Sequence, residues 1–208
     1  IIERGFPNSK ETPNNPDIFN PIYKNPVDSP VIISRLGLDG DYISNKKHHG
    51  GPDQAVYIYG QGDYDWWGLE LGKKFSPGTF GENLTISSLE SAGFTIGDRL
   101  SIGAVILEVT APRIPCDTFA TRMGDPGFID RFRNAERPGL YCRVLQEGKI
   151  RTGDEVTVEV DVFGTVIESV IDLSAIAGTQ AAYVAALSAI VARAPVPVTL
   201  DVQVAARP

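Results

Sequence analysis

Cys116 is the residue whose type and setting point most directly to chemistry. It lies in the segment 112–117, PRIPCD, which two prolines stiffen immediately after the β-branched run at 105–110. A thiolate at such a place can act as a nucleophile or bind a soft metal. The positive charge of Arg113 would lower the pKa of this thiol, whereas Asp117 would oppose that effect. The alternative is an ordinary buried cysteine that only packs.

The other cysteine and histidine side chains, which could bind a soft or borderline metal, are Cys142, His48 and His49. Cys142 shares one face of a predicted strand with other apolar residues, which indicates core packing. Neighbouring histidines point to opposite sides of an extended chain, and no CxxC or HxxxH spacing is present, so the pattern argues against a zinc site. A single histidine beside Gly50 and Gly51 can still donate to an anionic ligand. A solvated loop histidine is the alternative.

Three further residues stand in loops where side chains often carry function. Glu82 and Asn83 lie in the glycine turn at 80–84, FGENL, and Lys24 is a local positive charge near the N-terminus. Plain turn chemistry and solvated surface are the alternatives for these residues. The chain has no P-loop, GxSxG or GxGxxG pattern, so readings as a nucleotide-phosphate binder or a serine hydrolase lack a motif.

The elements that must position these residues are mostly strands. Alternating or β-branched runs predict strands at 31–33, 55–59, 84–86, 99–102, 105–110, 139–146 and 156–160. A short helix is predicted over 63–71 with Asp63 as its N-cap, and a weaker one over 119–134. Pro112 and Pro115 exclude a central strand at 111–118. The expected fold class is therefore mainly β, with a few short helices.

Composition limits the partners and the compartment. The 208 residues include 19 basic and 26 acidic side chains, for a net charge of −7, which argues against binding a nucleic-acid polymer or an anionic membrane. No apolar run approaches the ~18 residues of a membrane span, and the N-terminus shows no signal-peptide pattern, so we expect a cytoplasmic protein. We expect one domain over 1–160. A small C-terminal appendage over 161–208 would have a helix at 180–192, while 198–204 alternates like a strand.

In their order along the chain, the motifs resemble those of the MOSC domain family, named from the C-terminal domain of molybdenum cofactor sulfurase. The likeness is greatest to its stand-alone bacterial YiiM/YuaD type. It covers about residues 22–160, and a cysteine in PRxPC makes the ordered set specific. The stretches are YKNPV (23–27), GLDGD (37–41), HGGPDQAV (49–56), FGENL (80–84), IGD (96–98), PRIPC (112–116), RPGLY (137–141) and GDEV (153–156).

The resemblance implies a β-barrel-like domain that binds the molybdenum cofactor, a molybdopterin. In the family pattern Cys116 becomes the molybdenum ligand and a catalytic residue. Lys24, His49 and Arg113 match positions near the family's pocket, and His49 could supply a proton. Glu82 and Asn83 are then hydrogen-bonding partners for the pterin or supports of their loop. The appendage would be a degenerate form of the family's three-helix extension.

The resemblance also implies an activity, the reduction of small N-hydroxylated bases such as 6-N-hydroxylaminopurine. The chain has no flavin or iron–sulfur motif, and two cysteines cannot hold a cluster, so electrons would come from a separate donor protein. Pyridoxal phosphate is not expected. The oligomeric state stays open. One alternative is a non-catalytic carrier of the cofactor or of sulfur, with Cys116 holding a persulfide, and another is a silent β domain that uses these loops for interaction.

Overall fold

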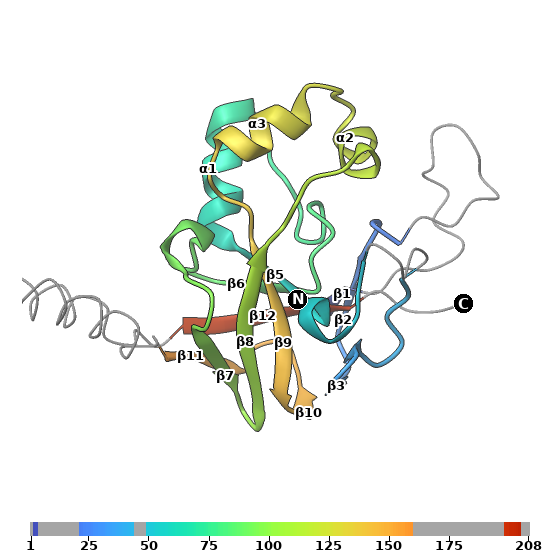
Figure 1. Cartoon of the computed structure of the whole chain (residues 1–208), viewed down its shortest axis with the longest axis vertical. Coiled ribbons are helices and arrows are strands. Elements are labelled where there is room, and N and C mark those ends of the chain that lie inside the picture. The colour runs from blue at the N-terminus through green and yellow to red at the C-terminus, as the bar shows by residue number, and fades with distance from the viewer. Residues whose placement is uncertain (1, 4–20, 44–48, 160–197, 205–208) are drawn as a thin grey trace, which may run out of the picture.

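A computed structural model describes residues 2–3, 21–43, 49–159 and 198–204 (Figure 1). Two short 3₁₀ helices, η1 and η2, accompany the strands and α-helices. The elements are, in chain order, β1 (Ile2–Glu3), β2 (Asn25–Val27), β3 (Val31–Ser34), β4 (Gly37–Leu38), η1 (Pro52–Gln54), β5 (Val56–Gly60), α1 (Gln61–Leu71), β6 (Leu84–Ile86), η2 (Ser91–Gly93), β7 (Arg99–Ile102), β8 (Val105–Pro112), α2 (Asp117–Met123), α3 (Phe128–Asn134), β9 (Leu140–Gln146), β10 (Gly148–Ile150), β11 (Glu155–Glu159) and β12 (Val198–Val204).

Strands of the described ranges close into a barrel in the order β1-β2-β12-β11-β7-β8-β9-β5-β6. The pairing of β1 with β6 completes the closure, and β12 also pairs with β6. β5 and β6 run parallel, while β7, β8 and β9 form an antiparallel series. A second sheet has the order β10-β3-β4. The mainly β, barrel-like fold that the strand patterns and the resemblance predict is confirmed.

The barrel interior is aliphatic because its strands alternate. In β8, Val105, Leu107 and Val109 are buried while the residues between them are partly exposed. Alternate side chains of a strand point to opposite faces, so this pattern places one face in the core. Cys142 belongs to the same core and is fully buried, which confirms its predicted packing role.

The three α-helices gather at one end of the barrel (Figure 1). Between them and the strands lies an aromatic cluster that includes Tyr59, Trp67, Phe80, Phe119 and Phe132. Phe80 stacks on Tyr59 with ring centroids 4.5 Å apart and lies 5.8 Å from Phe119. The FGENL turn and the start of α2 are therefore held against this end of the barrel by aromatic packing.

Two helix predictions differ from the structure. α1 begins at Gln61 with Gly60 as its N-cap, so the prediction of Asp63 as N-cap is wrong. Asp63 is instead buried and accepts hydrogen bonds from the Ser91 amide at 2.9 Å and from Arg137 at 3.1 Å. The single helix predicted over 119–134 is two helices, because the chain turns at Gly124 in the left-handed region.

The prediction that 111–118 forms no central strand holds only in part, because β8 continues to Pro112. A register shift occurs between Val109 and Ala111, and Pro112 pairs with Leu140 at the end of the ladder. A proline is tolerated there because the strand stops at that point. The predicted strand at 198–204 forms β12 and pairs with β11, β2 and β6. The helix predicted at 180–192 lies outside the described residues, so the appendage stays a prediction.

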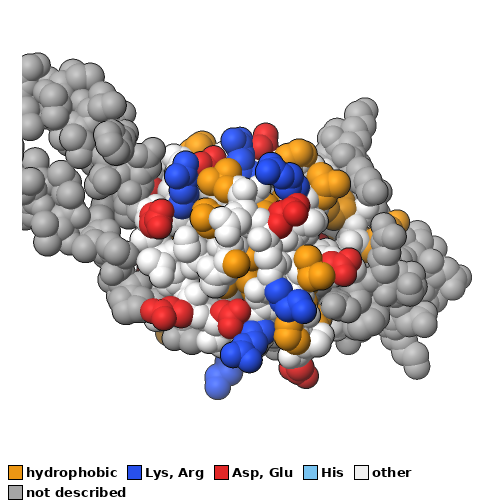
Figure 2. All heavy atoms as spheres, turned by 90° about the horizontal axis from the view of Figure 1, so that it is seen from below, with side chains coloured by type: hydrophobic (Ala, Val, Ile, Leu, Met, Phe, Trp, Pro, Cys, Tyr) orange, Lys and Arg blue, Asp and Glu red, His pale blue; other side chains and the backbone are white. Residues whose placement is uncertain are grey.

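Positively and negatively charged side chains are not segregated on the face of the molecule in Figure 2. Figure 2 shows one face on which basic and acidic side chains are interspersed and hydrophobic side chains form small separate groups. That face therefore presents no continuous basic stripe among its described residues. Among the helices of the described ranges, none is long and apolar enough to cross a membrane.

Candidate functional site

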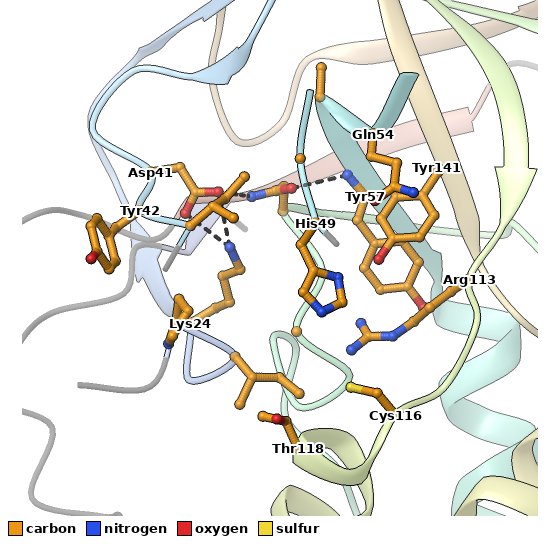
Figure 3. Close-up of a pocket in the computed structure, with 17 residues that line it drawn as sticks. Lys24, Asp41, Tyr42, His49, Gln54, Tyr57, Arg113, Cys116, Thr118 and Tyr141 are labelled. Atoms are coloured by element: carbon orange, nitrogen blue, oxygen red, sulfur yellow. Dashed lines mark hydrogen bonds and ion pairs between the residues drawn. The ribbon is translucent and has the colours of Figure 1, made fainter. Parts of the chain in front are cut away.

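A pocket of about 330 Å³ opens at the helical end of the barrel. It is assembled from segments far apart in the sequence, which the barrel closure brings together. Five of the six residues singled out from the sequence line it, and Figure 3 shows them with their neighbours. The lining residues are Pro21, Ile22, Lys24, Asp41, Tyr42, Ile43, His49, Gly50, Gln54, Ala55, Tyr57, Gly81, Asn83, Arg113, Cys116, Thr118 and Tyr141.

Cys116 occupies the point where the proline-rich loop enters α2. It is the N-cap residue of that helix, and its carbonyl accepts hydrogen bonds from the Phe119 and Ala120 amides. The thiol is partly exposed and borders the pocket. A hydrogen bond with His49 lowers the pKa of this thiol to about 7, aided by the Phe119 amide and the charge of Arg113 and opposed by partial burial. His49 thus contributes more than Arg113, the cation that the sequence identified.

Arg113 projects from the same loop and is almost completely buried. Its guanidinium lies over the ring of Tyr57, 4.8 Å from the centroid, and over that of Phe119, at 4.6 Å. Nη1 donates to the Phe80 carbonyl at 2.5 Å, whereas Nε is buried without a protein partner. Because stacking on two rings fixes the plane of the guanidinium, its charge and its spare donor are held at the pocket.

A polar network forms the opposite wall, with Lys24 across the pocket from Arg113 in Figure 3. Lys24 Nζ lies 2.9 Å from Asp41 Oδ1, and the two side chains are only 7% and 8% exposed. Asn83 Nδ2 donates to Asp41 Oδ2 at 2.8 Å, and Asn83 Oδ1 accepts from the Tyr57 amide at 3.0 Å. Lys24 and Asn83 are therefore pre-positioned by Asp41, which the sequence offered only as a turn residue.

Glu82 does not line the pocket, although the sequence groups it with Asn83. Its side chain is fully buried behind the turn. Oε1 accepts hydrogen bonds from the Tyr64 hydroxyl at 2.5 Å, the Gly78 amide at 2.7 Å and the Thr85 hydroxyl at 2.8 Å. Of the two roles left open for this residue, the geometry favours the support of its loop. The two neighbouring side chains are therefore separated, with Asn83 in the pocket wall and Glu82 behind the turn.

Sequence reasoning missed the aromatic side chains of the pocket and the amide side chain of Gln54. Gln54, Tyr57 and Tyr141 line it, and Gln54 Oε1 is buried without a protein partner. Burial raises the pKa of Tyr57 well above its ordinary value, so this residue remains a neutral phenol whose hydroxyl donates to the Pro138 carbonyl. Strand alternation could have indicated the face of Tyr57, but nothing local distinguishes a pocket-lining tyrosine from a core tyrosine.

Gly81 lies close to Ile22 and Arg113 in the pocket wall, and its φ is +74°. A Cβ atom on this residue would lie 2.8 Å from Ile22 Cγ1 and 3.4 Å from Arg113 Nη1. Gly72 has a similar φ of +62°, but a Cβ atom there would meet nothing within 4 Å. Glycine at position 81 is therefore required both by the backbone conformation and by the width of the pocket.

We expect Gly81→Ala to lower the free energy of unfolding by roughly 2–4 kcal/mol, because the left-handed backbone and the overpacking against Ile22 both contribute. Gly72→Ala, the matched control, should cost only roughly 1–2 kcal/mol, from the backbone alone. Urea unfolding followed by circular dichroism measures both values. Equal losses in the two variants would show that the Ile22 side chain moves aside without cost.

Alkylation of Cys116 by iodoacetamide in the cofactor-free protein should increase with pH, with a midpoint at about 7, because the thiolate is the reactive form. His49→Ala should move that midpoint upward and slow the reaction at neutral pH, since the hydrogen bond that favours the thiolate is lost. Peptide mass spectrometry follows the modification. Cys142 is the internal control, because burial raises its pKa and the side chain is inaccessible. A midpoint unchanged by His49→Ala contradicts this assignment.

The donor set determines which ligands the pocket can hold. Within the described part of the chain, no three His, Cys, Asp or Glu side chains lie close enough together to bind a metal ion by themselves. Cys116 alone offers a soft ligand, while Lys24, Arg113 and His49 provide positive charge or donors and Gln54 provides a spare acceptor. Such residues fit a molybdopterin, an anionic heterocycle that carries its own dithiolene ligands and a phosphate.

Comparisons with known proteins bear on the family and the fold of the chain. The family model of the MOSC domain matches residues 45–157. YflK of Bacillus subtilis (strain 168) is 34% identical over 132 residues, which are 64% of this chain and 60% of that protein. A protein named "Reductase" from Gibberella moniliformis is 34% identical over 146 residues, covering 68% of this chain and 26% of that protein. This chain therefore matches less than two thirds of the length of either relative.

Among solved structures, YiiM from Geobacillus stearothermophilus superposes with a TM-score of 0.59 at 27% sequence identity. The match covers 76% of this chain and 72% of that chain. The resemblance that the ordered motifs indicate is confirmed at the level of both sequence and fold. Since the family model spans more than half of its residues, this chain belongs to the MOSC domain family, with YiiM-like proteins among its relatives.

Proposed function

We propose that this protein binds a molybdenum cofactor in the pocket at the helical end of the barrel and reduces small N-hydroxylated compounds, bases such as 6-N-hydroxylaminopurine among them. The observation that carries the proposal is the convergence of Cys116, His49 and Arg113 on one pocket, opposite Lys24 (Figure 3). The relative named as a reductase supports an oxidoreductase, and the YiiM relatives support this type of domain.

Each residue has a distinct task in binding the cofactor. The Cys116 thiolate would ligate molybdenum, because a soft sulfur ligand suits a thiophilic metal. Arg113 and Lys24 would neutralise the anionic groups of the cofactor, and Arg113 Nε has a free donor for this purpose. Asn83 and Gln54 would bond to the edge of the heterocycle. When bound, the cofactor supplies a two-electron redox centre with an affinity for oxygen.

The reaction converts R–NHOH, two electrons and two protons into R–NH₂ and water, with cleavage of the N–O bond. The electrons come from a separate electron-transfer protein that carries its own redox group. His49 and Cys116 both line the pocket, and hydrogen bonding from His49 is the largest cause of the lowered pKa of the Cys116 thiol. The His49 imidazole is therefore placed to donate a proton to the departing oxygen, and solvent supplies the second proton. Arg113 stacks on the buried ring of Tyr57, which keeps that side of the pocket ordered.

Protein produced in a cofactor-synthesising host and purified without oxygen tests the proposal. We expect about one molybdenum and one pterin per chain, measured by metal analysis and by fluorescence of the oxidised pterin. A reduced viologen dye should then support conversion of 6-N-hydroxylaminopurine to adenine, followed by chromatography. Protein that carries no molybdenum after cofactor has been supplied would contradict the cofactor proposal, and loaded protein without turnover would contradict the reductase activity.

The second candidate is a carrier of the cofactor or of sulfur. A partly exposed thiol with a pKa of about 7 can also hold a persulfide, which favours this candidate specifically. Mass spectrometry of Cys116 after incubation with a persulfide-generating sulfurtransferase would detect the added sulfur. A carrier should accept the sulfur and show no turnover of N-hydroxylated compounds.

A further inference from the structure

A second hollow, of about 490 Å³, lies against the proline-rich loop and meets the cofactor pocket at Cys116. Here it is called the proline groove. Both the groove and the pocket are lined by five shared residues, His49, Gln54, Cys116, Thr118 and Tyr141. The residues that belong to the groove alone are Ala111, Pro112, Ile114, Pro115 and Asp117. Cys116 and His49 can therefore be approached from two sides.

The surface of the groove is chemically different from that of the pocket. Its own residues are mostly apolar, and Ile114 is 75% exposed. The ring of Tyr141 adds an aromatic surface on the shared side. Prolines on both sides of Ile114 restrict the backbone, so the apolar wall is largely pre-formed. A planar, partly apolar molecule would bury Ile114 and pack on Tyr141 at little conformational cost.

Charge separates the two hollows further. The cofactor pocket contains Arg113 and the Lys24–Asp41 ion pair, whereas the described lining of the proline groove contains Asp117 and neither lysine nor arginine. An anion in the groove would face the Asp117 carboxylate without a compensating arginine or lysine. A neutral molecule would meet no such repulsion, and a cation would be attracted.

The geometry points to the proline groove as the substrate subsite, which selects planar, uncharged or cationic N-hydroxylated compounds over anionic ones. This inference rests on the proposed function. With the cofactor in the pocket, a substrate in the groove would place its N–OH group at Cys116 and His49. The volume of the groove falls within the range that small-molecule sites occupy, which suits a bicyclic base or an aryl amidoxime.

Steady-state kinetics of the loaded protein with three benzamidoximes tests the subsite. The para substituent is hydrogen, aminomethyl (cationic) or carboxylate (anionic). We expect kcat/KM of the carboxylate compound to be about tenfold below that of the neutral compound. Ile114→Arg should raise the value for the carboxylate compound and lower it for the aminomethyl compound. Ile96→Arg is the matched control, because Ile96 is 71% exposed and lies outside both hollows.

Two further measurements separate failure of the subsite from failure of the proposed function. Hydroxylamine is too small to need the groove, so wild type and the control Ile96→Arg should both reduce it at the same rate. Calorimetry on the loaded protein should show that benzamidine binds more tightly than benzoate, and that Ile114→Arg weakens benzamidine. If hydroxylamine is reduced but the amidoximes do not discriminate, the subsite is wrong. If no N-hydroxylated compound reacts, the proposed reductase activity is wrong. The relative affinities for benzamidine and benzoate then decide whether the groove is a binding site of the proposed charge preference.

Discussion

Replacing Cys116 by serine is expected to reduce bound molybdenum from about one per chain to near zero and to abolish the reduction of N-hydroxylated compounds. The thiolate is the only soft ligand in the described pocket. A serine hydroxyl at neutral pH is not ionised and is a hard oxygen ligand. Metal analysis of protein from a cofactor-producing host, purified without oxygen, measures the first effect. A viologen-coupled assay measures the second.

The cysteine that packs in the core provides the control. Cys142→Ala removes the other thiol from a position away from the pocket, so molybdenum content should be retained. Cys116→Ser that keeps its cofactor but no longer accepts sulfur from a persulfide donor would favour the carrier. A change confined to the free energy of unfolding would favour a silent domain. Turnover by Cys116→Ser at the wild-type rate would remove Cys116 from the chemistry altogether.

Replacing Glu82 by alanine is expected to lower the free energy of unfolding by about 3–5 kcal/mol. The carboxyl oxygen accepts hydrogen bonds from Tyr64, Gly78 and Thr85, and all of these contacts are buried. Alanine removes the acceptor that these three buried donors share. The loss should also loosen the turn that carries Asn83. Urea denaturation followed by intrinsic fluorescence measures the stability.

Glutamine at position 82 is the matched variant. Its carbonyl oxygen can accept the same three hydrogen bonds, but its amide would replace Oε2, which has no protein partner in the described structure. We expect a loss of about 1–2 kcal/mol, clearly smaller than for alanine. Similar losses for glutamine and alanine would show that the carboxyl group itself, and not acceptance at Oε1, supports the loop.

Much of the fold was accessible from residue types and their periodicity. The alternation in 105–110 and the apolar runs around 56–60 and 140–146 correspond to β8, β5 and β9. Glycine turns and prolines located the loops. The errors arose where tertiary contacts compete with local preference. Asp63 could cap a helix by itself, but in the fold its carboxylate bonds to Ser91 and Arg137 instead. Strand partners, such as β12 between β11 and β6, depend on pairing that local pattern does not encode.

In the candidate site, too, some residues could be identified from the sequence, whereas their contacts with distant segments depended on the tertiary structure. Cys116 and Arg113 could be identified from the sequence because they share one short proline-stiffened loop, whose composition already indicates an exposed thiol near a cation. The influence of His49 on Cys116, the support of Lys24 by Asp41 and the separation of Glu82 from Asn83 were decided only by the closed barrel. Periodicity tells which face of a strand a side chain occupies. It does not tell which distant segment that face will meet, because this depends on register and closure of the whole sheet.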